Sequence, residues 1–309
     1  MDAGGPRGVS VVIPTYNNAG TLAEAVASVR SQRWPAIEII VVDDGSADET
    51  PQVLRDLAGP DLRAVRQANG GSSAARNTGI GLARREWIAF LDADDYWLPG
   101  KLAAQFDALE AQPTAMYSFT DVRVRYPDGS EAELRVRPFN RSLVLELIWG
   151  NMFGTPTVLV RRDCFESVGL FDTSLRTGED WDMWLRLASA YKEAYVGRPL
   201  VMVRRSPPVG KYAVETLAAC TRRVVDKLYA APEMSGRHPE LRGLKRRVYA
   251  WHSLVVAKSY CRQGVWGRGG PCRRRRAHGD RSGTAPAAGE PRARIRRQRT
   301  EHRGNRETL

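Results

Sequence analysis

Residues 87–95 read Trp87-Ile88-Ala89-Phe90-Leu91-Asp92-Ala93-Asp94-Asp95 and place three carboxylates directly after a run of five apolar residues. A short apolar run of this kind is typical of a strand buried inside a sheet. Three carboxylates in four residues repel one another unless a cation lies among them, and hard oxygen ligands suit Mg²⁺ or Mn²⁺. The alternative interpretation is an acidic turn before a helix that starts near Pro99, because acidic residues are common in turns.

Two earlier segments end in the same way. Residues 9–13 form a β-branched run that stops at Pro14 and leads into Thr15-Tyr16-Asn17. Residues 38–42 form a second apolar strand pattern, closed by Asp43-Asp44, and residues 62–65 form a weaker one. Helical spacing over residues 21–33, 72–83 and 101–111 separates these strands. The alternation predicts an α/β fold with a mostly parallel sheet sandwiched by helices, whose strand ends gather the polar residues at one edge.

The second half of the chain is less regular. Residues 115–141 predict strands joined by a turn at 126–130, residues 157–160 and 200–203 predict further strands, and residues 181–190 predict an amphipathic helix. Two more helices are expected afterwards, the second over residues 241–260. We therefore predict an α/β domain over residues 8–206, a helical appendage over 207–261 and an Arg-rich, disordered tail over 262–309.

The chain has 309 residues and a formal net charge of +12, but this charge is concentrated at one end. Residues 262–309 contain fourteen arginines and four acidic residues, so the remainder of the chain is nearly neutral. Nucleic-acid binding through the basic tail is an alternative function, yet residues 1–261 lack a basic face with interleaved aromatic residues. We therefore do not expect a nucleic-acid partner for residues 1–261.

No apolar run approaches the roughly 18 residues needed to span a membrane, and the first residues lack the apolar stretch of a secretory signal. The four cysteines are widely spaced without a CxxC pair, which fits reduced thiols. These features predict a cytoplasmic protein. Contact of the helices or the tail with anionic lipid at the inner face of the membrane is compatible with that location.

Three other segments carry candidate chemistry, each with a structural alternative. Asp43-Asp44-Gly45-Ser46 fits a turn in which Ser46 begins a capping box with Glu49, and Asp44 is left to bind a nucleobase or ribose. Residues 70–77 place two glycines before a helix that carries Arg76, so this is either an anion site or a loop with an N-cap. Residues 178–181 place Glu179-Asp180 before Trp181. A carboxylate held against aromatic surface has a raised pKa suited to a general base, but acids also stabilise a first helical turn.

Together, five segments resemble the family 2 glycosyltransferases, in that family's order and over about residues 8–206. They are Val12-Ile13-Pro14-Thr15-Tyr16-Asn17, Val41-Val42-Asp43-Asp44-Gly45-Ser46, Gly70-Gly71 through Ala75-Arg76-Asn77, Phe90-Leu91-Asp92-Ala93-Asp94-Asp95 and Gly178-Glu179-Asp180-Trp181. The resemblance implies a nucleotide-diphospho-sugar transferase fold of the GT-A type. It also implies an inverting transfer of a sugar from a nucleotide-diphospho-sugar donor to a hydroxyl of a glycan or lipid-linked acceptor, in surface glycan or polysaccharide biosynthesis.

The resemblance also implies the residues that bind the donor. Tyr16 and Asp44 would contact the base or ribose, Pro14 and Thr15 would line the same edge, and Arg76 would lie near the nucleotide.

A second group of residues is implied for the metal and the proton transfer. Asp92 would face the ribose or the water shell of a Mg²⁺ or Mn²⁺ ion, and Asp94 would be the direct metal ligand. Asp180 would be the general base, with Glu179 beside it contacting the acceptor.

One position departs from the family pattern. Family members often carry a histidine after the last strand that approaches the metal or the phosphates, whereas this chain has Val203-Arg204-Arg205-Ser206. Serine is a weaker ligand, so either Arg204 or Arg205 takes over neutralisation of the phosphates, or metal affinity is lower. A catalytically weak module that only binds nucleotide-sugar is therefore a further alternative.

Overall fold

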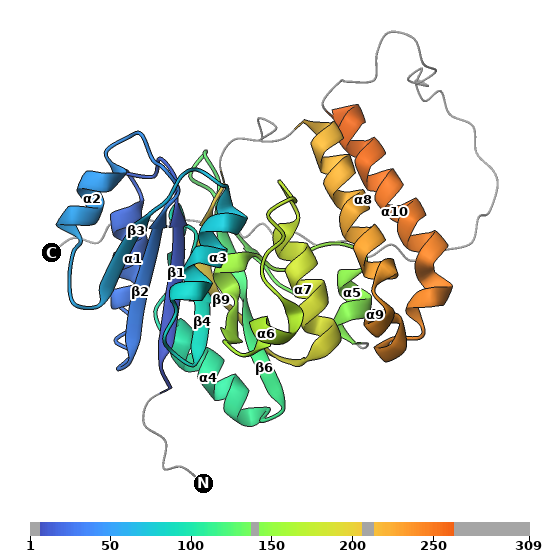
Figure 1. Cartoon of the computed structure of the whole chain (residues 1–309), viewed down its shortest axis with the longest axis horizontal. Helices are drawn as coiled ribbons and strands as arrows, with labels where there is room; N and C mark the ends of the chain where they lie inside the picture. Colours follow the sequence, from blue (N-terminus) through green and yellow to red (C-terminus); the bar gives the residue numbers. More distant parts are fainter. Residues whose placement is uncertain (1–6, 137–141, 206–212, 263–309) are drawn as a thin grey trace, which may run out of the picture.

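The computed structural model describes residues 7–136, 142–205 and 213–262. A β-sheet with helices on both faces occupies one side of the molecule, and two long antiparallel helices near the C-terminus lie on the other (Figure 1). The described residues do not include residues 1–6, Ser206 or the predicted tail beyond Arg262.

The sheet combines a parallel half and a mixed half, and its strands follow the order β3-β2-β1-β4-β8-β6-β9-β5, with β7 paired to β6. The parallel half consists of β3 (Leu62–Arg66), β2 (Ile37–Asp43), β1 (Val9–Thr15) and β4 (Trp87–Phe90). The mixed half consists of β8 (Leu159–Arg161), β6 (Ala115–Arg125), β9 (Lys192–Arg204), β5 (Tyr96–Trp97) and β7 (Glu131–Leu134). The predicted α/β fold with flanking helices is confirmed, and each antiparallel strand pair of the sheet involves β5, β7 or β8.

Alternating side chains of β1 pack into two separate hydrophobic cores, one on each face of the sheet. Val9, Val11 and Ile13 of β1 are fully buried against one helical layer, which includes α1 (Leu22–Arg30) and α4 (Lys101–Ala111). Val12, which points to the other face, belongs to the core with α3 (Ser72–Leu82) and α7 (Glu179–Ala190). A strand covered on both faces needs apolar residues at successive positions, and this is why the β1 sequence reads as a continuous apolar run.

Close packing of α3 on the sheet depends on one glycine. A Cβ atom on Gly79 would lie 2.3 Å from Cγ1 of Val12, so only glycine permits this approach. The remaining short elements are α2 (Thr50–Asp56), α5 (Leu143–Leu147), a 3₁₀ turn (Thr155–Thr157) and α6 (Cys164–Val168). The approach of α3 to β1 sets the position of the residues at the N-terminal end of α3, next to the strand ends.

The C-terminal helices pack on the same core as α7. They are α8 (Val214–Ala230), α9 (Pro232–Arg237) and α10 (Leu241–Arg262), and α8 and α10 lie side by side in Figure 1. Val224, Leu228 and Val248 are buried in the core that contains Trp181 and Trp184. None of the helices in the described part of the chain is long and apolar enough to cross a lipid bilayer.

Candidate active site

The carboxyl ends of three parallel strands bring the predicted site residues to one edge of the sheet. Thr15, the last residue of β1, pairs in register with Asp43 of β2, and β4 runs beside β1 into the segment Asp92–Asp95, called the acid loop below. The backbone N–H of Asp44 donates to the carbonyl of Thr15 at 2.9 Å, which joins the ends of β1 and β2. Parallel topology therefore produces the convergence that the sequence predicts.

The carboxylate of Asp44 is buried and anchors the loop that leads into α3. Its Oδ1 accepts hydrogen bonds from Nε2 of Gln67 at 2.7 Å and from the N–H of Gly70 at 2.9 Å, and its Oδ2 accepts from the N–H of Gly71 at 2.7 Å. Gly71 has a φ of +86°, a backbone conformation that favours glycine. Asp44 thus fixes the start of α3 against the end of β2, in addition to any contact it makes with a ligand.

The predicted capping box at Ser46 is wrong. Helix α2 begins only at Thr50, whose N–H donates to Oδ1 of Asp48 at 3.0 Å. The Oγ of Ser46 instead accepts from the N–H of Asn17 at 2.9 Å, and the N–H of Ser46 donates to Oδ1 of Asp43 at 2.8 Å. Ser46 therefore joins the segment after β1 to the end of β2 and does not cap α2.

The β1 end offers both buried and exposed groups. Pro14 is partly buried, and the Oγ1 of buried Thr15 has no hydrogen-bond partner among the described residues. Tyr16 is 48% exposed, which is unusual for a large apolar ring, and its carbonyl accepts from Nδ2 of Asn18 at 3.0 Å. An exposed ring beside a strand end offers a flat surface on which a planar group can stack.

Arg76 is buried and bridges two carboxylates from different elements. Its Nη2 donates to Oδ1 of Asp92 at 2.8 Å and its Nη1 donates to Oε1 of Glu179 at 3.0 Å. Burial alone would lower the pKa of Arg76, but the charges of Asp92 and Glu179 outweigh it and hold the pKa above its usual value. The Oε1 of Glu179 also accepts from Oγ of Ser72 at 3.2 Å, so the starts of α3 and α7 are joined at this point.

The three acid-loop carboxylates occupy different environments. Asp95 is buried, and burial together with the charges of Asp92 and Asp94 raises its pKa to about 8. The N–H of Arg204 donates to Oδ1 of Asp95 at 2.9 Å, and Nη1 of Arg204 donates to the backbone carbonyl of Asp94 at 2.8 Å. Asp95 therefore links the acid loop to β9, whereas the side chain of Asp94 is exposed to solvent.

Arg204 is held by further contacts at the end of β9. Its Nη2 forms an ion pair with Glu24 of α1, and its guanidinium lies 4.9 Å from the ring centroid of Tyr96. Arg204, one of the two residues predicted to substitute for the missing histidine, is thus fixed beside the acid loop by Glu24, Tyr96 and the Asp94 carbonyl. Arg205 is exposed.

The donor set at the acid loop fits a hard divalent cation that keeps open positions. No group of three or more His, Cys, Asp or Glu side chains that could hold a metal occurs among residues 7–136, 142–205 and 213–262. Mg²⁺ typically takes one or two protein carboxylates and completes its octahedron with water and substrate phosphates. Asp94, together with the half-buried Asp92, could supply such a partial set.

Asp180 lies in the first turn of α7, half-buried, with two hydrogen bonds to its carboxylate. Oδ2 accepts from Nδ2 of Asn151 at 2.7 Å, and Oδ1 accepts from the N–H of Trp181 at 2.8 Å. Burial and then the charge of Glu179 raise the pKa of Asp180 to about 6, although Arg76 opposes them. A carboxylate with this pKa is mostly ionised at neutral pH and can accept a proton from a hydroxyl.

The contacts connect four of the predicted site residues, Asp44, Arg76, Asp92 and Glu179, into one group. Asp44 holds Gly70 and Gly71, the adjacent Ser72 contacts Glu179, and Arg76 joins Glu179 to Asp92. Asn151 was missed by the sequence analysis, because the Gly150-Asn151 pair reads as an ordinary turn and its partner lies 29 residues later.

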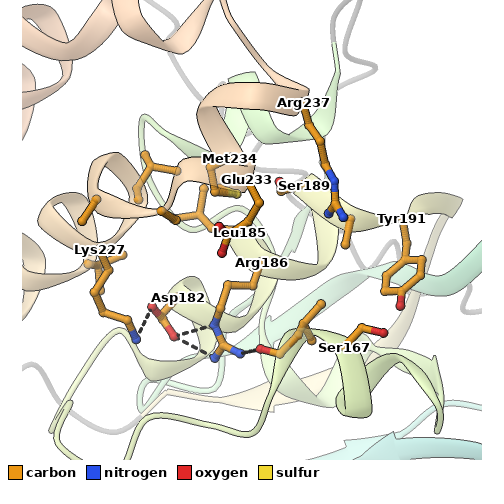
Figure 2. Close-up of a pocket in the computed structure, with 16 residues that line it drawn as sticks. Ser167, Asp182, Leu185, Arg186, Ser189, Tyr191, Lys227, Glu233, Met234 and Arg237 are labelled. Atoms are coloured by element: carbon orange, nitrogen blue, oxygen red, sulfur yellow. Dashed lines mark hydrogen bonds and ion pairs between the residues drawn. The ribbon is translucent and has the colours of Figure 1, made fainter.

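A cavity of about 530 Å³ lies elsewhere, between α6, α7, α8 and α9 (Figure 2). None of the predicted site residues lines it. Asp182 accepts from Arg186 and forms an ion pair with Lys227 at 2.7 Å, and Figure 2 shows these charges satisfying one another at the cavity wall. Asp182 follows Asp180 by two residues, which on a helix is a rotation of about 200°. The cavity therefore lies on the far side of α7 from Asp180.

Comparisons with known proteins agree with this arrangement. The chain is 34% identical over 259 residues to the succinoglycan biosynthesis protein ExoO of Rhizobium meliloti, covering 78% of this chain and 71% of that protein. It is also 34% identical over 192 residues to the uncharacterized glycosyltransferase RC0461 of Rickettsia conorii, covering 58% of this chain and 31% of that protein.

Solved structures share the fold at lower identity. S. aureus TarS in complex with UDP-GlcNAc superposes with a TM-score of 0.59 at 19% identity, over 75% of this chain and 72% of that one. The mannosyltransferase PcManGT from Pyrobaculum calidifontis, in complex with GDP-Man and Mn²⁺, superposes with a TM-score of 0.58 at 24% identity, over 86% and 77%. The family model described as glycosyl transferase family 2 matches residues 10–169, and with the ExoO similarity this shows that the chain is a member of glycosyl transferase family 2.

Proposed function

We propose that the chain is an inverting, metal-dependent glycosyltransferase that moves a sugar from a nucleotide-diphospho-sugar to an acceptor hydroxyl. The observation that carries the proposal is Asp180. It is a half-buried carboxylate whose pKa is raised to about 6, and the ion pairs of Arg76 connect its neighbour Glu179 to the acid loop. A base and a group of phosphate-side carboxylates at one edge of a sheet are the parts that sugar transfer requires.

Donor binding is assigned to the strand ends. The exposed ring of Tyr16 suits stacking on a nucleobase, with Pro14 and Thr15 along the same edge. Among the described residues, Oδ2 of Asp44 accepts one hydrogen bond, from the N–H of Gly71, so this oxygen retains capacity to accept another from the base or ribose.

The diphosphate is assigned to the acid loop and Arg76. Asp94 would bind Mg²⁺ or Mn²⁺ directly, and Asp92 would act on its water shell or on the ribose. A bound divalent ion supplies Lewis-acid stabilisation of the charge on the leaving diphosphate. Arg76 keeps its positive charge in this region because two carboxylates hold its pKa high.

The acceptor hydroxyl must lose its proton to a base during the transfer, and we assign this role to Asp180. As the acceptor oxygen forms its bond to the anomeric carbon, the bond from that carbon to the diphosphate oxygen breaks on the opposite face. The acceptor proton passes to the carboxylate of Asp180. Glu179 is less suited to this role because its Oε1 is already engaged by Arg76 and Ser72, so we assign it to positioning of the acceptor.

The biological acceptor is proposed to be a glycan or a lipid-linked glycan. ExoO, the relative with 34% identity over most of both chains, is described as a succinoglycan biosynthesis protein. By analogy the chain would act in surface polysaccharide biosynthesis, at the cytoplasmic side of the membrane. Peripheral contact with that membrane is part of this proposal.

The test uses the full chain with a panel of UDP-GlcNAc, UDP-glucose and GDP-mannose, each with Mn²⁺ or with EDTA. Release of nucleoside diphosphate should occur with at least one donor, should require the metal, and should fall by a factor of about 10² or more in Asp180→Asn. Donor binding, followed as thermal stabilisation, should survive in that variant. If neither wild type nor Asp180→Asn releases nucleoside diphosphate while both still bind nucleotide, the protein is a binding module and the proposal is refuted.

A further inference from the structure

Three successive backbone carbonyls at the end of α5 each accept a hydrogen bond from an aromatic ring N–H. The last carbonyls of a helix have no partner within the helix, so donors must come from elsewhere. The three bonds are Nε1 of Trp181 to the carbonyl of Leu147 at 2.7 Å, Nε2 of His252 to that of Ile148 at 2.8 Å, and Nε1 of Trp251 to that of Trp149 at 2.8 Å. One donor comes from α7 and two come from α10, more than 100 residues away in the chain.

The His252 bond fixes the protonation state of its ring. A carbonyl oxygen can only accept, so Nε2 must carry the proton. His252 is 7% exposed, and burial lowers its pKa, so the neutral ring with Nε2–H is the form present at pH 7. The bond is therefore available throughout the neutral range.

Ring packing adds to the hydrogen bonds at these three carbonyls of Leu147, Ile148 and Trp149, which we call the junction. The ring centroids of His252 and Trp181 lie 4.9 Å apart, and those of Trp149 and Trp251 lie 6.3 Å apart with an edge-to-face geometry. The ring packing restricts the position of segment 147–149. The hydrogen bonds also restrict its orientation, because a hydrogen bond is directional. Helix α10 and Trp181 thus hold the segment together, and they contact each other through the rings of His252 and Trp181.

The segment held in this way carries Asn151. Gly150 lies between Trp149 and Asn151, and Nδ2 of Asn151 donates to Oδ2 of Asp180 at 2.7 Å. Trp181, the residue after Asp180, is itself one of the three donors. Asp180 and the amide that orients it are therefore both attached to the same three-carbonyl junction.

We infer that Trp251 and His252 of α10 are positioning residues for sugar transfer, and that they act through residues 147–151 to hold Asn151 against the Asp180 carboxylate. This inference rests on the proposed role of Asp180 as the base. It makes α10 part of the catalytic unit, where the sequence had suggested an appendage.

The physical effect of the junction is to orient and stabilise one carboxylate. The charged groups that face Asp180 are Glu179, which raises its pKa, and Arg76, which lowers it, and the Asn151 bond also lowers it. Loss of that bond should raise the pKa of Asp180 and free the carboxylate to rotate. Misplacement of a reacting group costs rate without weakening donor binding, so kcat should fall while KM for the donor stays nearly constant.

The experiment compares Asn151→Ala, His252→Leu, His252→Gln and Trp251→Phe in the full chain. Gln can place an N–H where Nε2 of His252 stands, and Phe keeps most of the Trp251 ring while deleting its N–H. Tyr249→Phe is the matched control, since it removes a hydroxyl of α10 that bonds to Asp226 on α8 and not to the junction. Thermal denaturation verifies that each variant is folded.

Two readouts are used. The first is nucleoside diphosphate release with Mn²⁺ and the donor found active in the panel above. The second is a ¹³C titration of aspartate carboxyls, in which the Asp180 signal is identified by its loss in Asp180→Asn. The second readout needs no donor.

Asn151→Ala, His252→Leu and Trp251→Phe should lower kcat about tenfold with KM within about twofold of wild type, and should move the Asp180 titration to higher pH. His252→Gln should restore most of both properties, and Tyr249→Phe should match wild type. Unchanged kcat and unchanged Asp180 titration in His252→Leu and Trp251→Phe would overturn the inference. Failure of the proposed function looks different, because wild type and Asp180→Asn would then release nucleoside diphosphate equally, or not at all, whatever the α10 variants do.

Discussion

Arg76 and Asp92 form an ion pair in which Nη2 and Oδ1 are 2.8 Å apart, and the same guanidinium binds Glu179 at 3.0 Å. The arginine is 6% exposed in its side chain, whereas Asp92 is 30% exposed and Glu179 is 14% exposed. One buried cation therefore holds two carboxylates that would otherwise repel each other, one on the acid loop and one at the start of α7. This explains how an acidic site is stable before any divalent ion or diphosphate is bound.

Replacement of Arg76 by Met should destabilise the fold by about 2–3 kcal/mol, because it removes the charge that compensates two partly buried carboxylates. The lower part of that range allows for the solvent exposure of Asp92. Urea denaturation at pH 7 measures the change. Arg76→Lys keeps the charge but cannot bridge both partners with a planar fork, so it should fall between wild type and Arg76→Met.

The control for this prediction is Arg30→Met. Arg30 binds Asp61 through two nitrogens at 2.8 and 2.9 Å, yet its side chain is 36% exposed. An exposed pair of this kind is worth no more than about 1 kcal/mol. If Arg76→Met costs no more than Arg30→Met, the bridge contributes nothing beyond an ordinary surface pair.

Local sequence pattern was sufficient for the elements that carry the strand ends. The helix predicted over residues 101–111 matches α4, and the apolar runs at residues 9–13, 38–42 and 87–91 lie within or overlap β1, β2 and β4. These segments are buried on both faces, so their pattern is dictated by the core. The convergence of Tyr16, Asp44 and Asp92 at one edge follows from parallel topology alone.

The contacts that finish the site could not be predicted in this way. Asp180 receives Asn151 from a segment 29 residues earlier, and Ile148 is bonded by His252 from 104 residues later. The spacing around Ser46 predicted a helix cap, because a local pattern carries no information about Asn17, whose N–H donates to Ser46 from 29 residues earlier. Similarly, β9 extends over Lys192–Arg204 although only residues 200–203 read as a strand, because pairing with β6 extends it through polar positions.

The rate of transfer should depend on pH through Asp180. Only the ionised carboxylate can accept the acceptor proton, so kcat/KM should rise with pH through about 6, the value to which burial and Glu179 raise the pKa. Glu179→Gln removes the neighbouring negative charge and should move this limb to lower pH. Initial rates between pH 5 and 8 with saturating Mn²⁺ decide the matter, and a limb that does not respond to Glu179→Gln would assign the ionisation to another group.

Stability should show the opposite pH dependence at the same residue. The folded-state pKa of Asp180 lies above the ordinary value of 3.8, so the folded protein binds a proton that the unfolded chain has already released. Ionisation of Asp180 therefore destabilises the folded protein, and this destabilisation is fully present at pH 7–8. The free energy of unfolding increases as pH falls from above 6 toward 4, because Asp180 becomes protonated in the folded protein. Asp180→Asn, which abolishes the ionisation, should be more stable than wild type at pH 7.5 by about 1 kcal/mol, with the difference shrinking below pH 5.

Substitutions at two glycines of α3 should have opposite effects. Gly79→Ala would place a methyl group 2.3 Å from Cγ1 of Val12, which forces α3 away from β1 and should cost about 1–3 kcal/mol. Gly81 lies on the same helix with nothing within 4 Å of its Cβ position, so Gly81→Ala should stabilise the protein by about 0.5–1 kcal/mol. Thermal unfolding of the pair distinguishes close packing from helix propensity, and destabilisation by both substitutions would contradict the described approach of α3.

Metal binding should depend on Asp94 more than on any other exposed acid. The side chain of Asp94 is exposed to solvent, whereas Asp92 is half-buried and Asp95 is buried. Asp94→Ala should therefore weaken Mn²⁺ binding in the presence of UDP by at least about tenfold, because one carboxylate is a large share of a site completed by water and phosphate. Electron paramagnetic resonance of free Mn²⁺ during a titration measures this directly. Asp107→Asn removes an exposed acid from α4, outside the acid loop, and should leave the affinity unchanged. Equal Mn²⁺ affinity in Asp94→Ala and Asp107→Asn would move the ligand to another residue.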